Sequence, residues 1–252
     1  MKIAVLLAAI VLLCFNLDPW NPFPRQSLAV PSYFEPGSQW TQMQNAYPTV
    51  RTIVANPRNG PGDYRSDYVE HIDESQAAGL NVLGYVHTGY GSRSIAEVKA
   101  EIDNYYSWYG VDGIFLDEAS TDCQDAQDYY LDLYRYIKGK DGKTKVVVNP
   151  GMPTEECYME VANIVVTFEG SYDSYVNNYS TPSWVGDYSP RRFWHLVHSA
   201  PTITEMERAV RLSKDRNAGW VYVTPDTLSN PWDTLPPDVY WSRELSMVRS
   251  GY

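Results

Sequence analysis

The sequence predicts an α/β protein, a single-domain (β/α)8 barrel of the TIM type. Eight short runs of strand-forming residues recur along the chain, and a segment with helical spacing separates most neighbouring runs. The runs are apolar throughout instead of alternating, which is typical of parallel strands covered on both faces. Strands that alternate with helices over about 225 residues indicate a barrel. An open doubly wound sheet is the alternative, but no Gly-rich phosphate loop follows the first run, which disfavours its nucleotide-binding version.

The first residues have the pattern of a secretory signal. Lys2 supplies a positive start, and the apolar run 3–15 ends at polar residues. This run is shorter than the roughly 20 residues that a membrane-spanning helix needs. We therefore expect residues 1–27 to be a signal peptide and short lead, and residues 28–252 to form the barrel. The chain would be secreted, free or associated with a cell wall, with no stable membrane insertion, and Asn178 begins a glycosylation sequon.

The predicted strands leave room for a helix between most of them. They span residues 29–34, 52–56, 81–86, 113–117, 145–149, 164–168, 193–198 and 219–224. No internal repeat or low-complexity linker divides the chain, so we expect one domain.

Two segments between strands have the spacing of amphipathic helices. Ser94 and Glu97 have the separation of a capping box. One helical face after it carries Ile95, Val98, Ile102, Tyr105, Tyr106 and Tyr109. The same spacing recurs in Ala126, Tyr129, Tyr130, Leu133, Tyr134 and Ile137. Both faces are predicted to pack on the barrel.

A further helix is predicted after the seventh strand. Thr204 and Glu207 form its capping box in this interpretation, and Met206, Ala209 and Val210 lie on its apolar face. Glycines are expected to end helices just before the next strand, at Gly79, Gly110 and Gly219.

Composition limits the partners of the chain. Hydrophobic residues make up 44% and charged residues 20%, which is ordinary for a globular protein. The net charge of −11 argues against nucleic acid, because phosphate binding requires a basic surface, but it could attract a cationic polymer. The 21 Tyr and 8 Trp residues form either an aromatic core or, in part, a groove in which rings stack on sugars.

Two cysteines outside the predicted signal are expected to pair. Cys14 lies in the signal, which leaves Cys123 and Cys157, an even number in an exported chain. They follow the fourth and fifth strands, whose loops are neighbours in a barrel. A disulfide there would brace the loop that follows Asp117 and Glu118. Two free buried thiols are the alternative.

Carboxylates directly follow two of the apolar strands. The run 113–116 ends at Asp117 and Glu118, and the run 164–168 ends at Glu169. The C-terminal ends of barrel strands carry the active site, and a pair of acids there could cleave a glycosidic bond. Each acid alone could instead cap a helix or form a loop salt bridge. Because side chains alternate along a strand, one of the two adjacent acids should face the barrel axis and the other a neighbouring loop.

Other kinds of catalytic site have weaker support. No Ser-His-Asp order with a nucleophile elbow occurs, and neither does an HExxH or HxH pair. His195 and His198 are a close pair, but their spacing within a strand sends the two rings to opposite faces. Asp117 and Glu118 could hold a hard cation. We predict no metal and no cofactor.

Several short motifs resemble a known family. They are residues 30–33, 54–57, 60–62, 84–88, 113–120, 148–151 and 166–170. Together they resemble the spherulin-4-like proteins of spherulation-specific family 4, over nearly the whole chain. The resemblance implies a (β/α)8 glycoside hydrolase, and characterised fungal members cleave galactosaminogalactan as endo-α-1,4-N-acetylgalactosaminidases. The essential acids of the family match Asp117, Glu118 and Glu169, and a cysteine pair common in the family resembles Cys123 and Cys157.

The predicted function is hydrolysis of an amino-sugar polysaccharide by a secreted monomer. Asp117 would be the nucleophile and Glu169 the general acid and base, while Glu118 would orient a neighbour or tune its pKa. Weaker candidates for sugar contacts are Tyr33, Tyr85, His87, Asn149 and Trp194. The alternatives are a non-catalytic carbohydrate-binding or wall-associated barrel and a metal-dependent hydrolase of another class.

Overall fold

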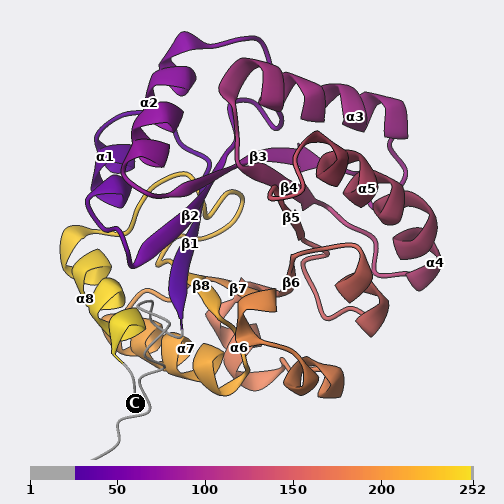
Figure 1. Ribbon diagram of the computed structural model, residues 1–252. Coiled ribbons are helices and arrows are strands. Elements are labelled where there is room, and N and C mark those ends of the chain that lie inside the picture. The colour runs from indigo at the N-terminus through magenta and orange to yellow at the C-terminus, as the bar shows by residue number, and fades with distance from the viewer. Residues whose placement is uncertain (1–25, 251–252) are drawn as a thin grey trace, which may run out of the picture.

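The computed structural model describes residues 26–250, which form a closed barrel of eight parallel strands in sequence order (Figure 1). The strands are β1 (Ser27–Ser32), β2 (Val50–Ala55), β3 (Asn81–His87), β4 (Gly113–Asp117), β5 (Lys145–Val148), β6 (Ile164–Ser171), β7 (Phe193–His198) and β8 (Trp220–Val223). Pairing of β8 with β1 closes the sheet. The predicted barrel is therefore confirmed. Residues 1–25 of the predicted signal and lead lie outside the described part of the chain.

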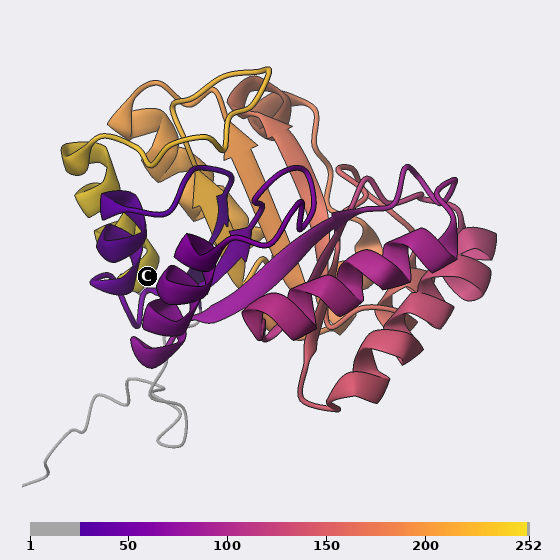
Figure 2. The same cartoon turned by 90° about the horizontal axis from the view of Figure 1, so that it is seen from above.

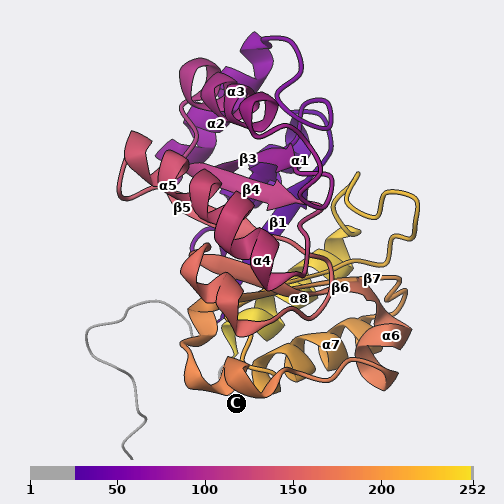
Figure 3. The ribbon, with the colours of Figure 1, turned by 90° about the vertical axis from the view of Figure 1, so that its right-hand side faces the viewer.

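Helices surround the barrel and cover its outer face (Figures 1 and 3). They are α1 (Ser38–Gln44), α2 (Ser66–Ala77), α3 (Ile95–Asn104), α4 (Cys123–Asp125), α5 (Leu131–Lys140), α6 (Tyr172–Asn177), α7 (Ile203–Asp215) and α8 (Asp238–Arg249). The π-helical turns are η1 (Tyr105–Tyr109) after α3 and η2 (Ala126–Tyr130) before α5. The 3₁₀ turns are η3 (Glu156–Glu160), η4 (Ser183–Asp187) and η5 (Pro190–Arg192). The chain between β5 and β6 thus passes through η3 instead of an α-helix.

The predicted apolar faces are the ones that the helices bury. On the first face Val98, Ile102, Tyr105 and Tyr109 are buried, and on the second Ala126, Tyr130, Leu133 and Ile137. The other predicted members are half-buried against the core, namely Ile95, Tyr106, Tyr129 and Tyr134. Tyr158, Tyr175 and Tyr222 are also fully buried. Much of the tyrosine content therefore belongs to the core.

The helix starts differ from the predicted capping boxes. Ser94 precedes α3 as its N-cap, but its side chain caps no backbone N–H among the described residues. The capping box of α7 consists of Thr202 and Glu205, each side chain bonding the other residue's backbone N–H. The box predicted at Thr204 and Glu207 is wrong, because the extended backbone of Thr202 places the start of the helix two residues earlier.

Two glycines predicted to end helices serve different purposes. Gly110 follows η1 in the left-handed conformation, with a φ of 58°, as expected for a helix end. Gly219 lies beyond Arg216, the C-cap of α7. A Cβ atom on Gly219 would lie 2.6 Å from the carbonyl oxygen of Pro190, so this glycine is needed for close packing instead.

The strands all deliver their C-terminal ends to one rim of the barrel. In Figure 2 the arrowheads of β6 to β8 point toward this rim, and the yellow loop between β8 and α8 arches over it. This loop spans residues 224–237. Residues at strand ends far apart in the sequence therefore meet beneath one long loop.

Glu244 is a buried acid on α8 that should make stability depend on pH. Its Oε1 accepts the Val223 N–H at 2.8 Å, and its Oε2 has no hydrogen-bond partner among the described residues. Burial raises the pKa of Glu244 to about 8. The folded chain therefore holds this proton more tightly than the unfolded chain, so the stabilisation is full below about pH 4.5 and is lost as pH rises toward 8.

Glu244→Gln should remove this pH dependence, since glutamine keeps the acceptor for Val223 and carries no charge. We expect no difference in melting temperature near pH 4, and a variant more stable by at least about 1 kcal/mol, or about 2–4 °C, near pH 9. Thermal unfolding followed by circular dichroism measures both values. The exposed Glu160 of η3 supplies the control Glu160→Gln. Equal stabilisation of both variants near pH 9 would refute the assignment to Glu244.

Candidate active site

A cavity of about 710 Å³ opens at the C-terminal rim of the barrel. Its walls include the C-terminal ends of several strands, residues 56–59 after β2, and residues 228–232 after β8. Asp117, Glu118 and Glu169 all line it. The three acids predicted from the strand ends are therefore neighbours in space.

Asp117 and Glu169 share one amide group. Asn149 Nδ2 donates to Asp117 Oδ1 at 2.7 Å and to Glu169 Oε2 at 2.6 Å. Because both oxygens bond the same nitrogen, they lie no more than about 5.3 Å apart. Retaining glycosidases hold their two carboxyl groups at about 5–5.5 Å, and inverting enzymes at about 6.5–9.5 Å. The upper limit for this oxygen pair lies within the first range and below the second.

The two acids differ in how they hold a proton. Burial and the nearby Asp117 carboxylate raise the pKa of Glu169 to about 7, although the bonds from Asn149 and Trp232 favour its charged form. Burial also raises the pKa of Asp117, but hydrogen bonds from Tyr85, from a backbone N–H and from Asn149 oppose this rise. With more donors directed at it, Asp117 is the acid that takes the negative charge first, and Glu169 keeps its proton.

A β-bulge in β6 turns Glu169 toward the cavity. The pairing of β6 with β7 shifts just before Phe168. His195 packs against α6. Thr167 Oγ1 lies 3.1 Å from His195 Nε2, and the Phe168 ring lies 6.3 Å from the same imidazole. Two successive side chains of β6 therefore face α6. Regular alternation would place Glu169 on that outer side together with Thr167. The sequence predicted that Glu169 directly follows the strand. This is wrong, because β6 continues to Ser171 and Glu169 lies inside it.

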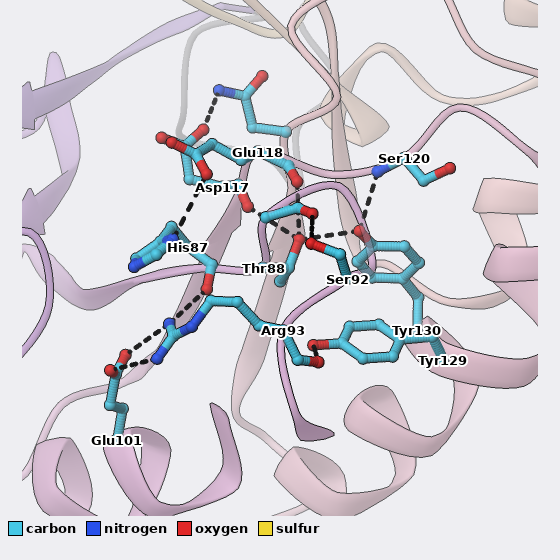
Figure 4. A network of polar contacts seen from close by, with 12 residues as sticks. His87, Thr88, Ser92, Arg93, Glu101, Asp117, Glu118, Ser120, Tyr129 and Tyr130 are labelled. Carbon is cyan, nitrogen blue, oxygen red and sulfur yellow. Dashed lines mark hydrogen bonds and ion pairs between the residues drawn. The ribbon is translucent and has the colours of Figure 1, made fainter. Parts of the chain in front are cut away.

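The Glu118 carboxylate lies beside His87 (Figure 4). Glu118 follows β4 with a left-handed φ of 48°, and its Oε2 lies 3.4 Å from His87 Nδ1. Its backbone carbonyl accepts Thr88 Oγ1 at 2.8 Å and the Tyr90 N–H at 2.6 Å. The adjacent acids thus face different neighbours, Asp117 the shared amide and Glu118 the loop after β3, but the cause is the left-handed backbone of Glu118 beyond the end of β4 and not alternation along a strand.

The loop after β4 is fixed by neighbouring elements. The hydroxyl of Tyr130 in η2 lies 2.8 Å from Thr88 Oγ1 and accepts a hydrogen bond from the Ser120 N–H at 2.9 Å (Figure 4). Cys123 and Cys157 form the predicted disulfide, which joins this loop to the segment after β5. The loop that follows Asp117 and Glu118 is therefore held both by Tyr130 and by the disulfide.

Trp232 and His198 belong to the cavity although they were not predicted as site residues. Trp232 Nε1 donates to Glu169 Oε1 at 3.2 Å, and its ring lies 6.2 Å from the imidazole of His198. Burial lowers the pKa of His198, which favours the neutral ring. Trp232 lies in the long loop after the last strand, where no spacing pattern marks a functional residue. His198 stands at the end of β7, a position that could have identified it.

Comparison with known proteins identifies the family. A sequence model of spherulation-specific family 4 matches residues 27–248. The chain belongs to this family. Spherulin-4 of Physarum polycephalum, a relative, is 40% identical over 163 residues, which are 63% of this chain and 48% of the relative. The chain therefore matches about half the length of that relative.

Solved structures share the barrel of this family 4 chain. Sph3 of Aspergillus clavatus, in complex with GalNAc, is 25% identical with a TM-score of 0.78, over 90% of this chain and 98% of Sph3. Dispersin B is 7% identical with a TM-score of 0.54, over 90% of this chain and 98% of that protein. At this low identity the second similarity concerns the fold alone.

The residues predicted as sugar contacts of the family 4 chain lie in different places. Tyr33 and Tyr85 line the cavity, with ring centroids 5.2 Å apart. Burial and Asp117 raise the pKa of Tyr85, so its hydroxyl remains a donor. His87 lies beside Glu118 and is not part of the cavity lining.

Trp194 requires a correction as a predicted sugar contact. Its side chain is 0% exposed and packs 5.4 Å from the ring of Phe115, away from the cavity lining. The physical reason is its position near the start of β7, far from the C-terminal rim. Its ring fills the barrel interior.

Residues 26–250 contain neither a cluster of metal ligands nor a membrane-spanning helix. No group of three His, Cys, Asp or Glu residues in this range is arranged to hold a metal ion. His195 packs against α6 while His198 lines the cavity, so the pair faces opposite sides of β7, as predicted. Within the same range, no helix has both the length and the apolar character needed to cross a bilayer.

Proposed function

We propose that this protein is a glycoside hydrolase of amino-sugar polysaccharides, with endo action on α-1,4-linked N-acetylgalactosamine or galactosamine. The observation that carries the proposal is the carboxyl pair Asp117 and Glu169, joined by one amide at the cavity wall. Membership of the family and the likeness to Sph3, determined in complex with GalNAc, support this class of sugar. The protein would act outside the cell as a monomer, and the disulfide between Cys123 and Cys157 supports an oxidising compartment.

The mechanism uses two displacements at the anomeric carbon. First, Asp117 attacks this carbon while Glu169 gives its proton to the leaving sugar's oxygen, so the glycosidic bond breaks and a glycosyl ester of Asp117 forms. Next, Glu169 takes a proton from water, whose oxygen attacks the same carbon and releases Asp117. Two inversions restore the original configuration, so the reaction retains it. Glu118 would position His87 and the loop after β3 at the cavity rim.

The charge of the cavity fits a neutral or cationic sugar. Three acids line it, and of the described Lys and Arg residues Arg58 alone does so. The whole chain carries a net charge of −11. An anionic polymer would be repelled, whereas an N-acetylated or partly deacetylated amino sugar would not.

A panel of polysaccharides tests the proposal. Galactosamine polymers of different degrees of acetylation would be incubated with the protein beside chitin, chitosan and hyaluronate, and reducing ends and product length would be measured. We expect reducing ends from the α-1,4-galactosamine polymers and a fall in chain length before monosaccharide accumulates. Release from none of the polymers would contradict a hydrolase, and release of monosaccharide alone would contradict endo action.

Tyr90 is expected to bind polymer at the rim of the cavity. Its side chain is 66% exposed, lines the cavity, and has a left-handed φ of 57° fixed by the bond from its N–H to the Glu118 carbonyl. Such a ring can stack on the apolar face of a sugar. Tyr90→Ala should raise the KM for polymer roughly threefold to tenfold with little change in kcat.

The control for this prediction is Tyr64→Ala. Tyr64 is also an exposed tyrosine, at 57%, but it does not line the cavity. Steady-state kinetics on polymer and on a short oligosaccharide would compare the two variants. A fall in kcat for Tyr90→Ala at unchanged KM, or the same change in both variants, would rule out the stacking role.

A further inference from the structure

Asn149 is oriented by contacts on both ends of its amide. Its Oδ1 accepts the Gly151 N–H at 2.9 Å, which fixes the oxygen and turns Nδ2 toward the acids. Both hydrogens of Nδ2 are then used, one by Asp117 and one by Glu169. A primary amide has two N–H donors, so none is left for a sugar hydroxyl. This use of the side chain differs from the sugar contact predicted from the sequence.

The backbone of Asn149 is tied to the strand that carries Asp117. Its N–H donates to the Leu116 carbonyl at 2.8 Å, and its own carbonyl accepts the Ala119 N–H at 2.9 Å. These bonds lie on either side of Asp117 and Glu118. Asn149 is also only 3% exposed. The amide is therefore held in the same rigid frame as one of the two acids, while the other acid reaches it from β6.

We propose that Asn149 is a positioning residue that holds Asp117 and Glu169 at the separation needed for two displacements and gives each acid one hydrogen bond. The proposal rests on the proposed function of these two acids. With the shared amide in place, the two oxygens cannot separate beyond about 5.3 Å without lengthening one of its two hydrogen bonds. Without it, the two acid side chains are no longer tied together, and each loses a donor that favours its ionised form.

Asn149→Ala tests this role by its effect on the pH profile. Both carboxyl groups should become harder to ionise, because the amide lowers the pKa of each. Both limbs of the kcat/KM profile should therefore move to higher pH by about one unit. We expect kcat to fall roughly 10–100-fold with a change in KM below about threefold, since the group acts on the acids and not on the sugar.

Asn163 provides a matched control on the opposite end of β5. Its Oδ1 accepts the Val146 N–H at 2.9 Å, so it supports the same strand far from the acids. Asn163→Ala should lower the melting temperature and leave both limbs in place. If Asn149→Ala does not fold, the nearly isosteric Asn149→Asp serves, and it should shift the limbs further because it adds a third carboxylate.

A second readout separates this inference from the proposed function. Titration of 13C-carboxyl-labelled protein by NMR reports the ionisation of Glu169 without turnover. If wild type releases no reducing ends, the proposed function is contradicted. An upward shift in the pKa of Glu169 in Asn149→Ala would still support the positioning role of Asn149. An unchanged titration would overturn the inference, and so would a variant of unchanged kcat and pH profile with a raised KM, which indicates a sugar contact.

Discussion

Replacing Glu169 with Gln is expected to lower turnover of the polymer by roughly 10²–10⁴-fold, the contribution typical of a general acid. Glutamine has nearly the same shape, but it has no proton to give to the leaving oxygen. Its single amide oxygen can keep the hydrogen bond from either Trp232 or Asn149, so the side chain should stay in place at the cavity wall. Reducing-end release near pH 5 measures the effect, with the exposed Glu160→Gln as the control.

An activated aryl glycoside makes the role of Glu169 specific. Its leaving group departs with little protonation, so Glu169→Gln should lose much less on this substrate than on the polymer. Glu118→Gln should show no such difference, because Glu118 lies beside His87 and not beside the amide-bridged pair. If instead Glu118→Gln shows the difference and Glu169→Gln does not, the acid has been assigned to the wrong residue.

The pH dependence of the same variant distinguishes lost chemistry from lost structure. As an acid with a pKa of about 7, Glu169 should lose activity as pH rises through that value. Its raised pKa also means that the folded chain binds this proton more tightly than the unfolded chain does. That stabilisation is present below about pH 4.5 and is lost as pH rises toward 7. The melting temperature of Glu169→Gln should therefore improve relative to wild type between about pH 5 and pH 8.

The parts of the fold that sequence reasoning predicted are those that repeat. Each strand is a local apolar run, and each main helix carries an apolar face at regular spacing, so neighbouring residues are enough to locate them. The start of α7 was missed because Thr202 and Thr204 each stand three residues before a glutamate. The backbone conformation of the preceding loop decides which threonine caps the helix, and the residues of the helix do not reveal that conformation.

The parts of the site that sequence reasoning missed depend on distant contacts. The bulge before Phe168 is set by pairing with β7, yet it determines the side of β6 on which Glu169 lies. Trp232 reaches Glu169 across 63 residues from a loop without a pattern. The role of Asn149 follows from one amide between two acids, whereas the sequence identified only its position after a strand.

Replacing Asp117 with Asn should nearly abolish hydrolysis, by on the order of 10⁴-fold, the upper end of what one catalytic carboxyl contributes. Asp117 would form the covalent bond to the sugar, and an amide is a poor nucleophile. The amide would also bring its own N–H donors to a site where Tyr85 and Asn149 already donate. Reducing-end release from polymer measures the loss, and circular dichroism shows whether the variant is folded.

The stereochemistry of the product tests the same residue without relying on the size of the loss. With the two acid oxygens no more than about 5.3 Å apart, wild type should first release the α anomer from an α-linked substrate, as 1H NMR can follow before mutarotation. Asp117→Ala leaves space in which azide can act as the nucleophile, so added azide should restore cleavage of an activated substrate and give a β-glycosyl azide. First release of the β anomer by wild type would mean a single displacement by water, and Asp117 would then be a base.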